Sequence, residues 1–446
     1  MMQPLEPATY GRVVCRALVG LTCALLAGDG SPAVAVGPAG PAQGKLVKYE
    51  VLGNQCAMPA AVQRQALRQQ AGTIAAGRVA PLVASPLRSI KDAYPSFAAV
   101  AVDPARNEVV FTDESLFQVM VYDRLENTAP DVAASSPKRV IAGERTNIEF
   151  QSGVHIDGAT GDIYAVNNDT RDTTIVFGTD AQGDVPPKRA FETPHGTFGI
   201  ASADAHNEVL LTLQHDAGIV TYAKNATGRD LPTRLLQGDQ TRLADPHGIA
   251  YDPIEDVIFV ANFGSRARRL APPGHKRPAT WPLERDEAVP GSGTISAASV
   301  TVYRRTAAGD TAPIRTIEGS LAQLNWPTGL AFDPDARELF IANDMGASVL
   351  VFDANASGNV RPKRVLQGPL TELANPTGIA LDLKNRELWV ANFGGHSGTV
   401  YDLSAAGNTP PKRRIRNAPR GTPSLMIGNP GAVTYDTTRE EVLVPN

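Results

Sequence analysis

Residues 377–416, TGIALDLKNRELWVANFGGHSGTVYDLSAAGNTPPKRRIR, decide the fold because they contain four strand-like segments in a row. The first segment, 378–382, is an apolar run of the kind found in strands that are buried on both faces. Segments 387–392 and 398–403 follow, and 411–415 carries a proline and three basic residues, which suit the edge of a sheet. The stretch therefore predicts a four-stranded antiparallel sheet whose last strand lies at an outer rim.

The same unit recurs along the chain. An aromatic residue at the end of the third segment precedes a Pro-x-Arg segment seven times, and in five of the seven copies the interval from aromatic residue to arginine is 12 residues. The aromatic residues are Tyr49, Tyr122, Phe177, Tyr222, Tyr303, Phe352 and Tyr401, and the arginines are Arg88, Arg139, Arg189, Arg234, Arg315, Arg364 and Arg413. A fixed spacing of this kind predicts an array of one supersecondary unit.

Small antiparallel sheets repeated radially form a β-propeller, which typically has four to eight blades. The motif Gly-Ile-Ala-x-Asp followed by Val-Ala-Asn, as in 248–262, resembles the NHL and YVTN-type propeller repeats, and the resemblance covers roughly residues 44–446. It implies an all-β fold of seven four-stranded blades. Because such repeats carry unrelated functions, the resemblance leaves the chemistry open.

The two ends of the repeat region are incomplete in complementary ways. Segments 45–51 and 86–90 correspond to the third and fourth strands of a blade, whereas 431–446 corresponds to the first and second strands. We therefore expect the N-terminal and C-terminal strands to pair in a seventh blade that closes the ring.

The N-terminus has the layout of a secretory signal peptide. Arg12 and Arg16 precede an apolar run at 17–27, and small residues follow up to Ala35. The sequence predicts a signal peptide at 1–35 and a single propeller domain at 36–446. It predicts a secreted or periplasmic protein, a monomer with no membrane attachment after signal removal, and a net charge of −4 argues against nucleic-acid binding.

Two insertions interrupt the repeat. One at 52–80 has the composition of a short amphipathic helix, and the other at 264–297 is basic and contains Trp281. The second lies between the second and third strands of its blade, on the face that propellers commonly use for ligands. It is either part of a site for an anionic or sugar-like ligand or a solvated loop.

Recurring polar residues are expected to support turns. An aspartate after the first strand and an asparagine or aspartate after the second lie ten positions apart in six copies, as in Asp252 and Asn262. Short side chains of this kind cap turns by bonding to nearby backbone. A polar ring for a metal or a glycan is the alternative interpretation.

Departures from the repeat indicate the candidate site. His195 and His247 occupy positions before a first strand where other copies have non-ligating residues, and they are the candidate catalytic residues. The candidate ligand-binding residues are His195, His215, His247, Asn262, Arg266, Arg268, Arg269, Trp281 and His396. The repeat positions assemble no three-histidine zinc site. No cofactor is predicted from these residues, although a divalent metal stays open.

Two functions of different classes fit these features. The favoured one is an exported binding or scaffold protein whose propeller face takes a small molecule or a protein, since the chain has no GxSxG, HExxH or CxxC motif. The alternative is a propeller lyase or hydrolase with a histidine-centred, metal-dependent site. Pro-His-Gly-Ile at His247 resembles peptidyl-hydroxyglycine lyases and streptogramin lyases, while a lactonase would require clustered carboxylates around a divalent metal.

Overall fold

The computed structural model describes residues 92–270, 278–282 and 288–425, together with residue 438 and the backbone of 434–436 and 441–443. The chain divides into two compact units, one of residues 91–427 and one of residues 1–90 and 428–446. The smaller unit contains an antiparallel pair, β27 (Thr434–Asp436) and β28 (Glu441–Leu443). The larger unit contains the strands that form the propeller.

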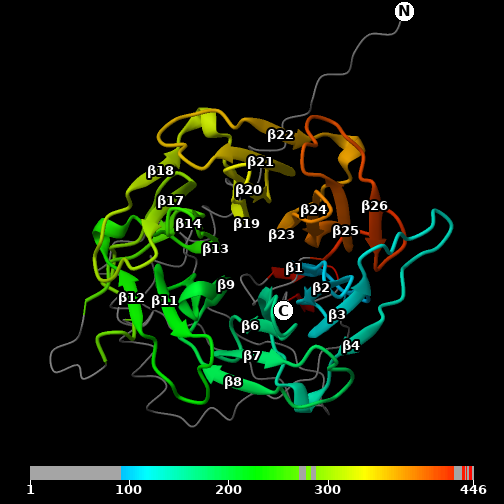
Figure 1. Ribbon diagram of the computed structural model, residues 1–446, viewed down its shortest axis with the longest axis horizontal. Coiled ribbons are helices and arrows are strands. Elements are labelled where there is room, and N and C mark those ends of the chain that lie inside the picture. The colour runs from blue at the N-terminus through cyan, green and yellow to red at the C-terminus, as the bar shows by residue number, and fades with distance from the viewer. Residues whose placement is uncertain are drawn as a thin grey trace, which may run out of the picture. The chain divides into compact units, whose positions relative to one another are not determined.

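Within the described part of the larger unit, six four-stranded antiparallel sheets are arranged around a common axis (Figure 1). We name them blades 1 to 6 in chain order and their strands a to d from the axis outward. Blades 1 to 3 are β1 (Phe97–Asp103), β2 (Glu108–Asp113), β3 (Gln118–Asp123), β4 (Arg139–Ile141); β5 (Gln151–Ile156), β6 (Ile163–Asn167), β7 (Thr173–Phe177), β8 (Arg189–Glu192); and β9 (Thr197–Ala203), β10 (Glu208–Leu213), β11 (Gly218–Ala223), β12 (Arg234–Gln237). Blades 4 to 6 are β13 (Pro246–Asp252), β14 (Val257–Asn262), β17 (Ser299–Arg304), β18 (Arg315–Glu318); β19 (Pro327–Asp333), β20 (Glu338–Asn343), β21 (Ser348–Asp353), β22 (Arg364–Gln367); and β23 (Pro376–Asp382), β24 (Glu387–Asn392), β25 (Ser397–Asp402), β26 (Arg413–Arg416). The prediction of four-stranded antiparallel blades is therefore confirmed.

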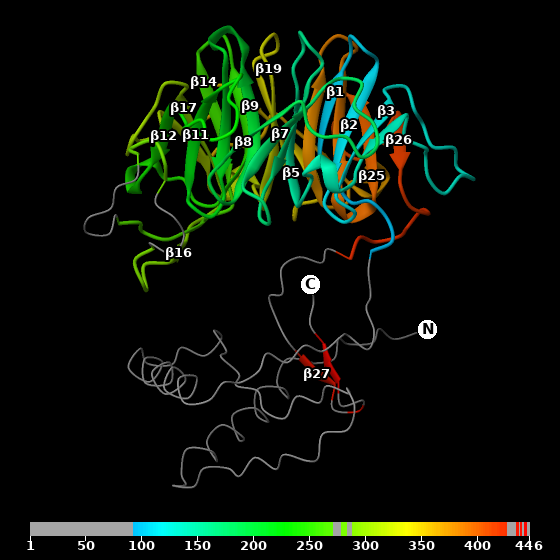
Figure 2. The same ribbon diagram turned by 90° about the horizontal axis from the view of Figure 1, so that it is seen from below.

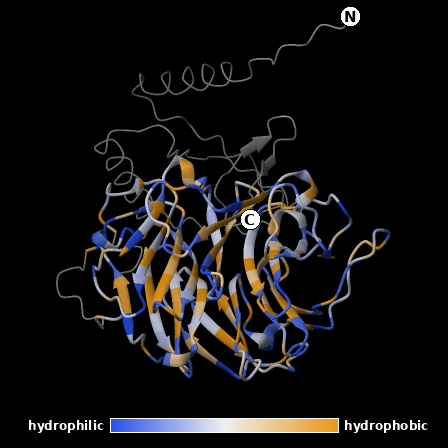
Figure 3. Ribbon diagram, turned by 45° about the horizontal axis from the view of Figure 1, so that its top comes forward, coloured by the Kyte–Doolittle hydropathy of each residue, from blue (hydrophilic) through white to orange (hydrophobic). Residues whose placement is uncertain are grey.

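The hydrophobic core lies between neighbouring blades. The colouring of Figure 3 places hydrophobic residues along the strands of the ring and hydrophilic ones in many of the loops. The strand c aromatic residues 122, 177, 222, 303, 352 and 401 are all buried. They pack between sheets as the sequence predicts, and burial of aromatic area of this kind contributes strongly to stability.

Glycines in strand a let neighbouring inner strands approach closely. A Cβ on Gly153 would lie 2.5 Å from the carbonyl oxygen of Phe198 in the next blade, and one on Gly329 would lie 2.7 Å from that of Thr377. The equivalent glycines of the other blades are Gly199, Gly248 and Gly378, while blade 1 has Ala99 at this place. The small residue at this position therefore sets how tightly the inner strands pack around the axis.

The recurring aspartates and asparagines hold turns, which confirms their predicted role. Oδ1 of Asp103 accepts hydrogen bonds from the backbone N–H groups of Ala105 and Arg106, and Asp333 does the same for Asp335 and Ala336. Each bond satisfies a backbone donor that the turn would otherwise leave unpaired. These aspartates therefore stabilise the link between strands a and b.

The strand d arginines join each blade to the next one. Arg364 pairs with both carboxylate oxygens of Glu338 in its own blade, at 2.8 and 2.7 Å, and also donates to the carbonyl oxygen of Leu403 in blade 6. The hydrogen bonds from Arg364 lower the pKa of Glu338 to about 2. Similar bonds to a carbonyl of the following blade are made by Arg139, Arg189, Arg234, Arg315 and Arg413. Hydrogen bonds therefore connect the charged outer strand of each blade to the next blade.

The described ring closes directly between blade 6 and blade 1. Thr377 of β23 donates its hydroxyl to the carbonyl oxygen of Ala98 at 2.8 Å, and Phe97 shares a buried cluster with Trp389. Arg413 of blade 6 donates to the carbonyl oxygen of Arg124 in blade 1. This corrects the predicted seven blades to six in the described ring, because strand a of the last blade packs against strand a of the first with no blade between them.

The predicted closure by the chain ends is not supported either. Segments 45–51 and 86–90, which were expected to complete the seventh blade, lie outside the described residues, as do the predicted signal peptide and the insertion at 52–80. Strands β27 and β28 form a two-stranded sheet of the smaller unit. Among the described residues, no helix has the length and apolar character needed to cross a membrane.

Candidate functional site

One face of the ring carries the loops between strands b and c and the loops between blades, and we call it the b–c face. The two kinds of loop are joined by repeated backbone bonds, such as Gln214 N–H to the carbonyl of Gly196 and Asp344 N–H to that of Trp326. The insertion of blade 4 extends from this face as the ribbon β15 (Ser265–Arg266) with β16 (Thr294–Ile295), seen at the lower side of the ring in Figure 2. Loops of neighbouring blades therefore meet there.

The axis of the ring offers little room. The channel between the inner strands has a volume of ≈ 70 Å³ and is lined by strand a residues, including the glycines described above. This is less than the 300–1,000 Å³ or so of typical small-molecule sites. A ligand site is therefore better sought among the side chains on the b–c face than inside the channel.

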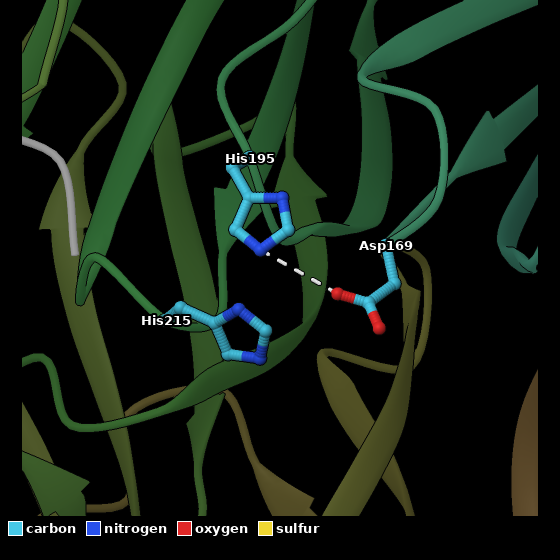
Figure 4. A group of neighbouring side chains, drawn as sticks. All are labelled: Asp169, His195 and His215. Atoms are coloured by element: carbon cyan, nitrogen blue, oxygen red, sulfur yellow. Dashed lines mark ion pairs between the residues drawn. The ribbon is translucent and has the colours of Figure 1, made fainter. Parts of the chain in front are cut away.

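Asp169, His195 and His215 converge on the b–c face where blades 2 and 3 meet (Figure 4). Asp169 comes from the loop after β6, His195 from the loop between β8 and β9, and His215 from the loop after β10. One ligand atom from each residue lies within 4.8 Å of the others, and Nε2 of His195 is 3.4 Å from Oδ1 of Asp169. Among the described residues this is the one group of His, Cys, Asp and Glu side chains that meets in this way.

A second carboxylate orients the ring of His195. Its Nδ1 lies 3.1 Å from Oδ1 of Asp172, on the opposite side of the imidazole from Asp169. The hydrogen bond to Asp172 raises the pKa of His195, and the negative charge of Asp169 acts in the same direction. With the proton of the neutral ring held on Nδ1 by Asp172, the lone pair of Nε2 faces Asp169 and His215. This is the orientation that a metal-binding histidine requires.

The donor set matches known kinds of metal centre. Two imidazole nitrogens and one carboxylate oxygen, with a further position open to water or substrate, are the ligands of many catalytic zinc sites. The same set binds iron(II) in oxygenases that leave open positions for substrate and oxygen. The three side chains are partly buried, so they are both held in place and reachable. The cluster can therefore hold a divalent transition metal.

His247 lies in the same region of the face but is enclosed. Its side chain is stacked on Phe263 at 3.5 Å between ring centroids and also contacts Phe198, and the residue is 3% exposed. Its Nδ1 lies 3.0 Å from the carbonyl oxygen of Asp245, and burial lowers the pKa of His247 to about 3. The ring is therefore neutral at pH 7 and packs as part of an aromatic stack.

Two other predicted site residues lie apart from the cluster. His396 is fully buried at the joint of blades 6 and 1, where its Nδ1 donates to the carbonyl oxygen of Pro95 at 2.7 Å. Asn262 is also fully buried, and its amide bonds to the backbone of Ala244 and to Thr301. Both residues contribute to the scaffold in this structure.

The arginines of the insertion differ from one another in their surroundings. Arg266 and Arg268 lie 3.7 Å from the carboxylate of Asp239, and the Arg268 side chain is 58% exposed. The side chain of Arg269 is 9% exposed and reaches the loop of His215. Trp281 is half-buried, and its N–H donates to the carbonyl of Pro278. The three arginines therefore do not form one open basic patch.

Asp169 was missed by the sequence analysis. It lies in the loop Asn168-Asp169-Thr170-Arg171-Asp172 between β6 and β7 of blade 2, which carries two carboxylates. Its nearness to His195 and His215 arises from the packing of blades 2 and 3 and is not visible in the sequence. Asp245 and Asp344, in other loops of the b–c face, belong to no such group in the described part of the chain.

Comparison with known proteins gives a partial match. A family model described as the SMP-30/gluconolactonase/LRE-like region matches residues 296–412, which run from β17 to the start of strand d of blade 6. The matched stretch covers about a quarter of the chain and leaves out Asp169, His195 and His215. No curated protein matches the chain.

Solved structures include a similar chain titled hydrazine synthase from Kuenenia stuttgartiensis. It is 12% identical, with a TM-score of 0.46, and the alignment covers 81% of this chain and 98% of that one. At that level the likeness carries no argument about what this protein does.

Proposed function

We propose that this protein is a metal-dependent hydrolase that acts on ester or lactone carbonyl groups, with a zinc-class ion held by Asp169, His195 and His215. The observation that carries the proposal is the convergence of these three side chains within 4.8 Å on one face of the ring. The partial match to a gluconolactonase-like region supports the choice of a lactone or ester over other substrates.

A bound divalent ion would supply an activated water and would polarise the carbonyl oxygen of the substrate. The residues of this chain have separate tasks. The imidazoles of His195 and His215 and the carboxylate of Asp169 would bind the ion. Asp172 keeps the proton of His195 on Nδ1. The cluster lies among the loops of the b–c face and not inside the narrow channel. Its side chains are partly exposed, so a substrate can approach it from solvent.

The binding or scaffold function favoured from the sequence has less support. Its anionic ligand was expected at the arginines of the insertion, where Arg269 turns toward Asp216 and the other two lie beside Asp239. The lyase interpretation relied on His247, which is enclosed by aromatic rings. Export to the periplasm or the medium stays part of the proposal and rests on the predicted signal peptide alone.

Metal titration of the full chain tests the proposal. We expect Zn²⁺ or Co²⁺ to bind with one ion per chain in isothermal titration calorimetry, and His195→Gln, His215→Gln and Asp169→Asn each to abolish or strongly weaken binding because each removes a ligand. His206→Gln is the matched control, since His206 lies in the loop between β9 and β10 of blade 3, away from the cluster.

Hydrolysis is measured with para-nitrophenyl acetate and glucono-δ-lactone before and after chelation. We expect chelation to remove activity and added metal to restore it in the unaltered protein but not in the ligand variants. A chain that binds no divalent ion, or whose hydrolysis is indifferent to the chelator, contradicts the proposal.

A further inference from the structure

One arginine of the blade 4 insertion, Arg269, reaches back to the loop that carries His215. Nη2 of Arg269 donates to the backbone carbonyl of His215 at 2.8 Å and lies 3.1 Å from Oδ1 of Asp216. The Arg269 side chain is 9% exposed and that of Asp216 is 2% exposed. The contact is therefore a buried ion pair combined with a hydrogen bond to the backbone of a candidate metal ligand.

The described residues beside Arg269 are held by backbone bonds. Arg269 pairs with Ala288 in an antiparallel bridge, and the N–H of Val289 donates to the carbonyl oxygen of Arg268. The N–H of Arg268 in turn donates to the hydroxyl of Ser292 at 3.0 Å. The backbone next to Arg269 is thus fixed, so the guanidinium presents its donors to blade 3 from a supported position.

Buried pairs of this kind impose geometry. An ion pair taken out of water is retained only with good geometry and further hydrogen bonds, and the loss of one partner leaves the other charge buried without compensation. In this protein the pair fixes the short loop between β10 and β11, and this loop places His215 beside His195. Groups that orient a metal ligand from behind typically change metal affinity by about 10–100-fold when they are removed.

We infer that Arg269, in the blade 4 insertion, is a positioning residue for the proposed metal site and holds the His215 loop in its ligand geometry. The inference rests on the proposed function. It replaces the prediction that Arg269 binds an anionic ligand, because its guanidinium faces His215 and Asp216 within the protein. Arg268, its exposed neighbour, lies beside the carboxylate of Asp239 instead.

The test compares Zn²⁺ affinity in the full chain of the unaltered protein, Arg269→Met, Arg269→Lys and the control Arg268→Met. We expect Arg269→Met to weaken binding by about 10–100-fold, Arg269→Lys to recover part of the loss, and Arg268→Met to bind as the unaltered protein does. The visible spectrum of the Co²⁺-loaded protein should change in Arg269→Met, because ligand geometry changes.

A second variant separates positioning from stability. The double substitution of Arg269→Met with Asp216→Leu removes both buried charges, so the fold is expected to tolerate it better than the single change. It still lacks the bond to the His215 carbonyl and should still bind Zn²⁺ weakly. Unchanged affinity in this folded variant overturns the inference alone, whereas no binding by the unaltered protein overturns the proposed function and the inference together.

Discussion

Asn262 illustrates how a recurring polar residue supports the propeller. Its Oδ1 accepts the backbone N–H of Ala244 at 3.1 Å, and its Nδ2 donates to the carbonyl of Val260 and the hydroxyl of Thr301. Asn343 and Asn392 make comparable bonds in blades 5 and 6. The side chain therefore ties the loop between blades to the end of strand b, and it leaves no polar atom facing a ligand.

Asn262→Ala should destabilise the protein without changing metal binding. The substitution leaves a buried backbone N–H and a buried hydroxyl short of a partner, which costs about 1–3 kcal/mol. Urea unfolding measures the loss, and a Zn²⁺ titration of the same variant provides the comparison. An Asn262→Ala protein of full stability but impaired binding would show that the residue belongs to the site after all.

Part of the site could be predicted from single residues. His195 and His215 stand out because they break the repeat, and the structure brings them together with ring centroids 5.1 Å apart. Asp169 could not be chosen in advance, since aspartates in loops usually serve turns and its nearness to His195 depends on how two blades are packed. His247 and His396 looked equivalent to the others because a sequence motif does not reveal that a histidine is buried.

Strand a glycines act at the scale of the element. Their position was visible in the Gly-Ile-Ala-x-Asp motif, but the reason for it lies in the neighbouring blade, whose backbone approaches too closely for a side chain. For the Pro-x-Arg motif, too, the position was visible in the sequence but the contact with the neighbouring blade was not. The sequence predicts an outer edge strand there, which is confirmed, whereas the bond from Arg364 to the carbonyl of Leu403 required knowing which blade follows.

Gly248→Ala should therefore be strongly destabilising. The added Cβ would overlap the backbone of Thr328 in blade 5, so β13 and β19 must separate, and overpacking of this kind costs about 1–3 kcal/mol or more. Gly158→Ala is the control, because nothing lies within 4 Å of its added Cβ. Thermal unfolding followed by circular dichroism measures both; equal midpoints for the two variants would contradict the close-packing argument.

The number of blades is a property of the whole molecule and was predicted incorrectly. The sequence supplied a count of repeat motifs, including the incomplete ones at 45–51 and 431–446, and a complete ring was assumed to use all of them. Ring size depends instead on the distance between inner strands, which the glycines reduce. Six blades in the described ring already bring β23 into contact with β1, so the remaining motifs are not needed for closure.

Thr377→Val tests the closure between blades 6 and 1. It removes the bond from Thr377 to the carbonyl of Ala98, and the loss should be about 0.5–1.5 kcal/mol. Ser152→Ala removes the equivalent bond from blade 2 to blade 3 and should cost a similar amount. Thr328→Val, which affects only a bond to nearby Trp326, is the control. If Thr377→Val cost nothing in urea unfolding while Ser152→Ala did, the ring would not close between these blades.

Each described blade is made from strands that are consecutive in the chain, so no blade is shared between the two ends of the ring. The ends nevertheless meet, because the N–H of Leu425 donates to the carboxylate of Asp92 at 2.9 Å. A force that pulls these two residues apart would act first on the contacts between blades 6 and 1, which include the backbone bonds from the N–H groups of Thr128 and Ser135 to the carbonyls of Arg414 and Arg416. The chain itself does not connect blades 6 and 1 at this joint, so it is the place where a short linker could connect the ends and let the chain begin at a different blade.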